Sequence, residues 1–180
     1  IFSKNGITVS ATGGGAMLEA SAGRLYLIPR RDEIARMDRD GGNYTVISTN
    51  AFVENEILEG QDGMLYLIKA DVVGSANYKM DKDGGNITTI LPGVLGRGFY
   101  SLRQRPDGRL YGLGVKDFPS DGFFFSVDTN GLGYVQRVGL FTTALEPGSF
   151  FQATDGFFYY SNGAGSTNDR GVLLRLGTNV

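Results

Sequence analysis

The sequence predicts an all-β fold, a β-propeller built from four four-stranded antiparallel blades. Three observations lead to this prediction. A pattern of a turn followed by an apolar strand, first written Ala22-Gly23-Arg24-Leu25-Tyr26, recurs three more times. The tyrosines of successive copies lie 40, 45 and 48 residues apart, which is the spacing of propeller blades. Glycine accounts for 28 of the 180 residues, and no helical periodicity is present.

Each copy opens a unit of four short strands. The strands on either side of the first turn form a hairpin, because glycine accepts the positive φ that this turn requires. A third strand, a second glycine turn and a fourth strand follow. In chain order, the predicted strands are residues 17–20, 25–28, 33–37 and 44–48, then 57–60, 65–68, 77–80 and 87–91, then 100–105, 110–113, 123–127 and 134–140, and finally 150–153, 157–160 and 172–176.

We expect a single propeller domain over residues 1–180. The fourth unit lacks a fourth strand of its own, whereas residues 2–9 have the pattern of a third strand's end, a turn and a fourth strand. Residues 6–11 are therefore expected to complete the last blade and close the ring, which removes an exposed sheet edge. The alternative is a four-blade section of a larger propeller. The units are approximately residues 16–49, 56–91, 99–140 and 149–180.

Composition excludes several classes of function. The net charge is −2 and charged residues make up 20%, so the chain has no electrostatic basis for binding nucleic acid or an anionic membrane. No apolar run has the length of about 20 residues that a membrane helix needs. Histidine and cysteine are both absent, which removes the Ser-His-Asp triad and every histidine-containing metal site. We therefore expect a protein that is not an enzyme, does not bind nucleic acid and does not insert into a membrane.

One unit also carries a family pattern. Asp107-Gly108-Arg109-Leu110-Tyr111-Gly112, followed by Gly122-Phe123-Phe124-Phe125 and Asn130-Gly131, resembles the bacterial Gloeo-Verruco (GloVer) repeat. More weakly, residues 34–43 are similar to YWTD-type propeller repeats. The resemblance implies a bacterial propeller that is secreted, periplasmic or on the cell surface. It supplies no activity.

Loop length predicts which side of the blades binds a ligand. The first and second turns of each unit are short and uniform, whereas the loops between the second and third strands and between units vary in length. Variable loops on a rigid frame are where binding usually resides, so we expect a glycan or a protein to bind on the loop side. Phe118 and Tyr160 are expected to be exposed there. The candidate binding residues are Arg30, Lys69, Phe118, Tyr160, Asn162 and Asn168.

A second candidate site lies on the innermost strands. Equivalent positions of the four units, four residues before each turn glycine, hold Glu19, Glu59, Gln104 and Gln152. These side chains are expected to line a central channel. A solvated ring without a cofactor is the favoured interpretation, and a calcium ion held by Glu19 and Glu59 is the alternative, because carboxylate and amide oxygens suit that ion. Residues 38–43 and 81–86 superficially resemble calcium loops, but hairpins with a glycine bulge explain them with fewer assumptions.

The sequence thus predicts a non-enzymatic binding or scaffold propeller with an unidentified protein or glycan partner. Two alternatives stay open. The first is a structural fragment that oligomerises by strand exchange instead of remaining a monomer. The second is a histidine-independent lyase or hydrolase that uses the carboxylates of Glu19 and Glu59.

Overall fold

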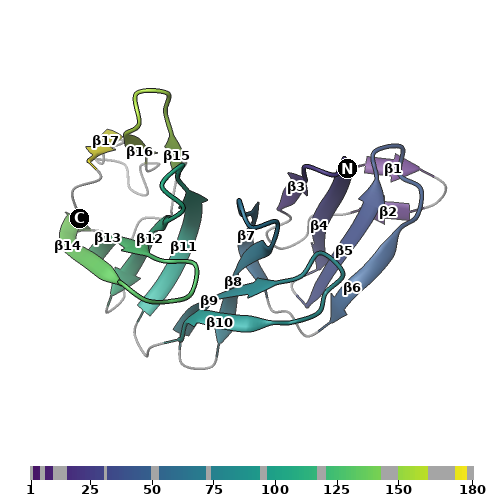
Figure 1. Cartoon of the computed structure of the whole chain (residues 1–180), viewed down its shortest axis with the longest axis horizontal. Coiled ribbons are helices and arrows are strands. Elements are labelled where there is room, and N and C mark those ends of the chain that lie inside the picture. Colours follow the sequence, from purple (N-terminus) through teal and green to yellow (C-terminus); the bar gives the residue numbers. More distant parts are fainter. Residues whose placement is uncertain are drawn as a thin grey trace, which may run out of the picture. The chain divides into compact units, whose positions relative to one another are not determined.

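The computed structural model divides the chain into two compact units, residues 1–94 and residues 95–180 (Figure 1). It describes residues 2–4, 7–9, 16–30, 32–49, 53–71, 74–93, 97–116, 121–142, 150–161 and 173–177. All the regular elements of these residues are β-strands, and every pairing given below is antiparallel. The all-β prediction is confirmed. We describe each unit by itself, and a single domain over the whole chain stays a prediction.

The first unit contains the first two sequence repeats, each as four consecutively paired strands. Its opening hairpin pairs β1 (Phe2–Lys4) with β2 (Ile7–Val9). The first repeat forms β3 (Met17–Glu19), β4 (Arg24–Arg30), β5 (Glu33–Asp38) and β6 (Thr45–Thr49). The second repeat forms β7 (Val53–Glu59), β8 (Leu65–Asp71), β9 (Gly74–Met80) and β10 (Thr88–Leu91).

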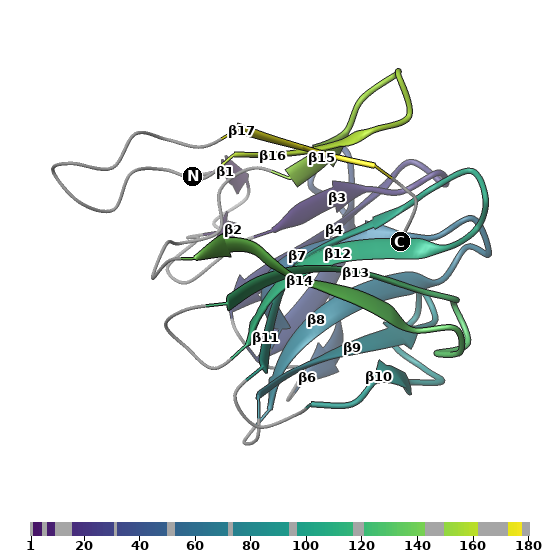
Figure 2. The same ribbon diagram turned by 90° about the vertical axis from the view of Figure 1, so that its left-hand side faces the viewer.

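The second unit contains the other two repeats. The third repeat forms β11 (Arg97–Gln104), β12 (Leu110–Lys116), β13 (Asp121–Val127) and β14 (Val135–Thr142), and Figure 2 shows the last three of these side by side. The fourth repeat forms β15 (Phe150–Gln152), β16 (Phe158–Ser161) and β17 (Leu173–Leu176), three strands among the described residues. The hairpin predicted within residues 2–9 is confirmed, and its completion of the last sheet stays a prediction.

The first turn of every repeat has the same hydrogen bonds. In the second repeat, the Gly63 amide donates to the Gly60 carbonyl at 2.9 Å, and the Gly60 amide donates to the Met64 carbonyl at 2.9 Å. Gly63 has a φ of 77°, a left-handed conformation that other residues adopt only at a steric cost. The equivalent pairs of bonds close the other three turns, so the repeated pattern encodes one hairpin geometry.

The second turns are glycine-bulge hairpins, as predicted, and their acidic side chains bond their own turn. The Gly42 amide donates to Asp40 Oδ1 at 2.8 Å, and the Asn43 side chain donates to Asp38 Oδ2 at 2.6 Å. The second repeat has the same two bonds, from the Gly85 amide and the Asn86 side chain. The acidic residues therefore stabilise the turns, and the interpretation as a hairpin is confirmed.

Apolar side chains between neighbouring sheets form the core of each unit. In the first unit, Tyr26 and Ile34 of the first repeat belong to one buried cluster with Leu65, Leu67 and Met80 of the second. In the second unit, Tyr111 and Phe124 pack with residues of the fourth repeat, where Phe158 lies 5.1 Å from the Tyr111 ring. Sheet faces within each unit therefore pack on each other through their apolar residues.

Two glycines of β12 make room for the aromatic core of the third repeat. A Cβ at Gly112 would collide with the Phe125 ring, and a Cβ at Gly114 would collide with the Phe123 ring. Both phenylalanines are fully buried. The aromatic-rich sequence of this repeat is thus used for packing between and across strands.

The repeated tyrosine is buried in the first three repeats and half-buried in the fourth. Tyr26, Tyr66 and Tyr111 are at most 4% exposed, whereas the Tyr159 ring stacks on Phe151 at 5.6 Å near solvent. The adjacent Tyr160 is 1% exposed and packs in the core. The prediction that Tyr160 is exposed is therefore wrong, because alternation along β16 turns its ring to the buried face.

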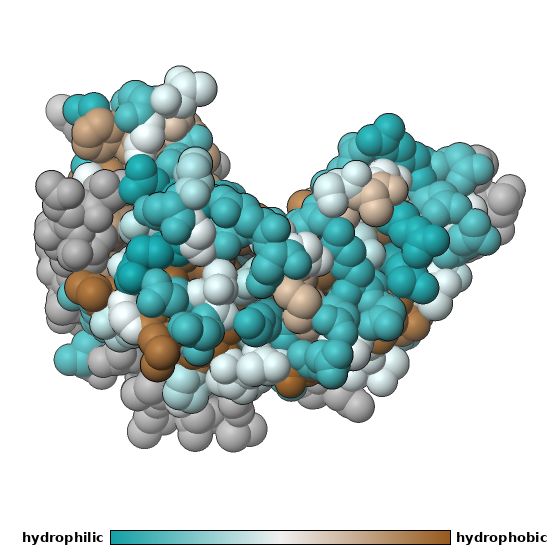
Figure 3. All heavy atoms as spheres, viewed as in Figure 1, coloured by the Kyte–Doolittle hydropathy of each residue, from teal (hydrophilic) through white to brown (hydrophobic). Residues whose placement is uncertain are grey.

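Figure 3 shows that hydrophilic residues make up most of the visible described surface, with apolar residues scattered among them. No helix that could span a membrane occurs among the residues that the structure describes.

Candidate binding cleft in the first unit

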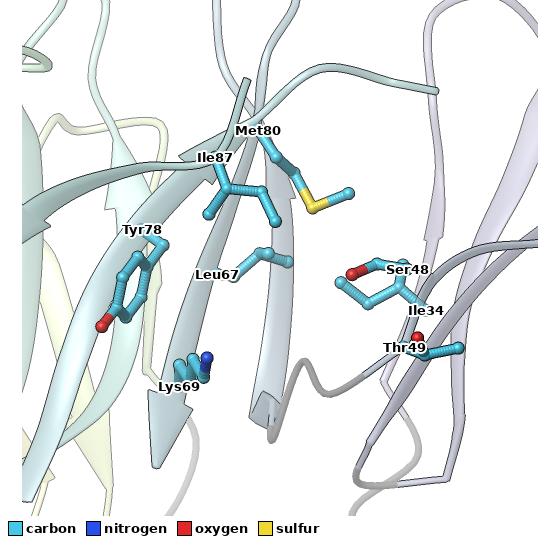
Figure 4. Close-up of a pocket in the computed structure, with 8 residues that line it drawn as sticks. All are labelled: Ile34, Ser48, Thr49, Leu67, Lys69, Tyr78, Met80 and Ile87. Carbon is cyan, nitrogen blue, oxygen red and sulfur yellow. The ribbon is translucent and has the colours of Figure 1, made fainter. Parts of the chain in front are cut away.

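A cleft lies between the first and second repeats and is formed by the first unit alone. It is open to solvent, and its volume of about 330 Å³ includes solvent space at its mouth. The first repeat contributes Ile34, Ser48 and Thr49 on one side, and Figure 4 shows the second repeat's side chains facing them. Those side chains are Leu67, Lys69, Tyr78, Met80 and Ile87.

Strand register places the second repeat's side chains on one wall. Leu67 of β8 lies opposite Tyr78 of β9, and Lys69 is two residues further along the same face of β8. The Lys69 ammonium lies 5.5 Å from the centre of the Tyr78 ring. A cation over an aromatic face is stabilised by the ring's quadrupole, so Tyr78 positions the charge at the cleft wall.

The two ends of the cleft differ in composition. Met80 ends β9 and Ile87 precedes β10, so both lie beside the second turn of the repeat. Thr49 ends β6 and Lys69 lies near the end of β8. The cleft therefore has an apolar end, with Met80 and Ile87 beside the turns, whereas its other end combines Lys69 and Thr49 with Ile34, which is paired with Ser48.

The side with the short turns carries a separate ionic network. Glu59 accepts hydrogen bonds from the Ser21 amide at 2.6 Å and from the Ser21 hydroxyl at 2.7 Å, and it pairs with the Lys82 ammonium. Burial acts to raise the pKa of Glu59, but the bonds from Lys82 and Ser21 outweigh it and lower the pKa below its ordinary value. Glu59 is therefore held as a carboxylate that joins the two repeats.

The predicted channel residues make different local contacts. Glu19 pairs with Arg39, whereas Glu59 pairs with Lys82, so each carboxylate has its own cationic partner. The Gln104 amide donates to the Gly108 carbonyl at 2.8 Å within its own turn, and Gln152 lies half-buried opposite Phe158. In the described part of the chain, no three acidic, histidine or cysteine side chains form a group that could hold a metal. The common ring of these four residues and the calcium alternative stay predictions.

The structure places the predicted loop-side residues in different surroundings. Lys69 lines the cleft, whereas Arg30 is exposed at the end of β4 with its guanidinium 3.8 Å from Glu33. Tyr160 is buried in the second unit. Phe118, Asn162 and Asn168 lie outside the described residues.

Sequence reasoning missed Tyr78 and the hydroxyls of Ser48 and Thr49. Tyr78 lies inside β9, whereas variable loop length indicates loop residues. The available signal was the alternation in β9, which places Tyr78 and Met80 on the face of the sheet that also holds Lys69.

Known structures resemble this chain in fold. A structure of a protein assigned as a gluconolactonase matches 93% of this chain and 65% of its own, with 11% identity and a TM-score of 0.64. A protein from Agrobacterium tumefaciens assigned as TolB matches 76% of this chain and 54% of its own, with 14% identity and a TM-score of 0.59. A chain of the nidogen/laminin complex matches 83% of this chain and 57% of its own, with 15% identity and a TM-score of 0.57.

The chain therefore spans 65% or less of the length of these three structures. No family model and no curated protein matches the chain. At these identities the likeness concerns the fold and not the activity. Together with the repeated antiparallel sheets, it shows that the chain has the β-propeller fold, with four blade-like repeats.

Proposed function

We propose that this chain is a non-enzymatic binding domain that captures a protein partner at the loop end of the cleft between its first two repeats. The observation that carries the proposal is the arrangement of an apolar cleft that ends in Lys69 and the side chains of Ser48 and Thr49. A patch of apolar surface with a few oriented polar groups is the usual composition of a recognition site.

The state of Glu59 supports binding in preference to acid–base catalysis. A general acid at neutral pH needs a carboxyl group whose pKa is raised. The pKa of Glu59 is instead lowered, and its oxygens are engaged by Ser21 and Lys82. Glu19 is engaged by Arg39 on the same side. Both carboxylates of the lyase or hydrolase alternative are therefore engaged in ion pairs, which supports a binding role.

The same proposal includes a location outside the cytoplasm: the protein is secreted, periplasmic or on the cell surface. The sequence resemblance to bacterial GloVer repeats supports it. One of the similar structures also comes from a complex between two proteins, nidogen and laminin. Another has the name of an enzyme, so the fold alone does not choose between binding and catalysis.

Selection from a displayed random-peptide library, in parallel with a glycan array, tests the proposal. We expect wild-type protein to select peptides that no longer bind a variant carrying Lys69→Met and Thr49→Val. The matched control is Arg30→Met, which removes an exposed cation outside the cleft and should keep binding. Selected ligands that bind all three proteins equally would contradict the proposed site. Glycans that bind only through Lys69 and Thr49 would contradict the protein partner.

A further inference from the structure

The residues on the floor of the cleft indicate what kind of chemical group can bind there. Ile34 and Met80 are fully buried, and Leu67 is 4% exposed, so the floor of the cleft is made of fixed aliphatic and thioether groups. Such a floor favours an aliphatic group, because burying apolar surface releases about 25 cal/mol per Å².

The cation at the other end, Lys69, has no anionic partner among the side chains that the structure describes. Lys69 makes no ion pair with any described residue, whereas Lys82 and Arg39 of the same unit each pair with a glutamate. The Lys69 residue is half-buried, and its ammonium is held over Tyr78. A half-buried ammonium that faces a cleft complements a carboxylate, and the hydrogen bond between two such groups is stronger than one between neutral groups.

The first repeat supplies two hydroxyl groups to the cleft. Ser48 and Thr49 place hydroxyls on the wall opposite Lys69, as Figure 4 shows. A hydroxyl both donates and accepts, so it can bond a peptide amide and carbonyl. A sugar is a poorer match, because the face of Tyr78 on which it would stack is occupied by the Lys69 ammonium.

We infer that the cleft binds the C-terminal residue of a partner polypeptide when that residue has an aliphatic side chain. The side chain enters the apolar end, the terminal carboxylate pairs with Lys69, and the last peptide group bonds Ser48 or Thr49. This inference rests on the proposed function and adds the chemical identity of the group that is recognised.

N-acetyl-L-leucine is the smallest probe that contains all three groups, and N-acetyl-L-leucinamide differs from it only in lacking the carboxylate. Each is titrated into the full chain while the methyl NMR signals of Ile34, Leu67, Met80 and Ile87 are followed. The acid should shift these signals with a dissociation constant about tenfold lower than that of the amide, since hydrogen bonds to charged groups contribute roughly twice as much as neutral ones. The preference for the acid should decrease as salt is added.

Two variants separate a charge effect from a folding defect. Lys69→Met should bind the acid and the amide equally, whereas Lys69→Arg should retain the preference for the acid. Equal affinities of wild-type protein for the two probes, measured at the same methyl groups, would overturn the carboxylate inference and leave the binding cleft in place. Absence of any shift at these methyl groups would overturn the inference, and the library selection would then decide the proposed function independently.

Discussion

A single aspartate in the repeated turn makes two bonds at once. In the second repeat, Asp62 accepts from the Met64 amide at 3.1 Å and from the Tyr66 hydroxyl at 2.6 Å. In the third and fourth repeats, Asp107 and Asp155 accept the same pair of bonds. The pattern Asp-Gly-x-x-Tyr thus joins the turn to the strand that follows it, which explains why the two residues recur together.

Removing this aspartate should destabilise its repeat. We expect Asp62→Ala to lower the free energy of unfolding by about 1–2 kcal/mol, because the buried Tyr66 hydroxyl and the turn amide both lose an acceptor. The first repeat allows the reverse test, because Ala22 occupies the position that Asp62 occupies in the second repeat. Ala22→Asp should raise stability by up to about 1 kcal/mol. Urea denaturation of both variants measures this, and an unchanged Asp62→Ala midpoint would contradict the account.

Two turn glycines with similar backbone conformations differ in their surroundings. Gly84 has a φ of 94°, and a Cβ there would collide with the carbonyl oxygen of Ile47 in the neighbouring repeat. Gly63 has a φ of 77°, and a Cβ there would meet open space. Gly63→Ala should therefore lower the free energy of unfolding by about 1–2 kcal/mol, because alanine is strained in the left-handed conformation.

Gly84→Ala should cost more than Gly63→Ala by at least about 1 kcal/mol, because the backbone of the first repeat must also move. The difference in free energy of unfolding between the two variants is the quantity to measure. Equal losses would show that the two repeats do not approach each other at Ile47.

The second repeat contains an ion pair between Glu59 and Lys82 whose contribution to stability should depend on pH. The lowered pKa of Glu59 lies below the value of 4.5 for an unperturbed glutamate. Its contribution to stability is therefore complete above pH 4.5 and is lost as the pH falls through the lower, folded-state pKa. Glu59→Gln should reduce stability by about 1 kcal/mol at neutral pH, and the difference from wild type should shrink as the pH falls through the lowered pKa of Glu59.

Glu19→Gln is the matched control for this experiment. The Glu19 and Arg39 side chains are 50% and 69% exposed, whereas those of Glu59 and Lys82 are 14% and 27% exposed. The more exposed pair should contribute no more than about 0.5 kcal/mol. A difference between wild type and Glu59→Gln that stays constant across the acid range would contradict the assignment of the pH dependence to Glu59.

The strands could be predicted from sequence because turn chemistry and alternation are local signals. The four copies of the turn pattern predicted where the hairpins lie. The observed strands begin and end close to the predicted ones. The cleft could not be predicted in the same way, because it depends on how two neighbouring sheets pack. Lys69 was found among the loop-side cations, but Tyr78 was missed and Tyr160 was assigned to the wrong face.

For the whole molecule, the sequence predicts that residues 6–11 complete the last blade. We expect removal of residues 1–11 to leave the last repeat without the strand that the sequence assigns to it. An unpaired sheet edge promotes association, so the truncated protein should form dimers or precipitate. Size-exclusion chromatography with light scattering, compared with the full chain, measures this. A truncated monomer as stable as the full chain would contradict the assigned strand.

One unit of forty-odd residues, written four times, folds into four antiparallel sheets that begin with the same hairpin. An experimental structure at side-chain resolution is the decisive measurement. We expect antiparallel sheets at every repeat, with Tyr26, Tyr66 and Tyr111 each buried after an identical glycine turn. Helical density in any repeat, or unlike surroundings for Tyr26 and Tyr111, would contradict it.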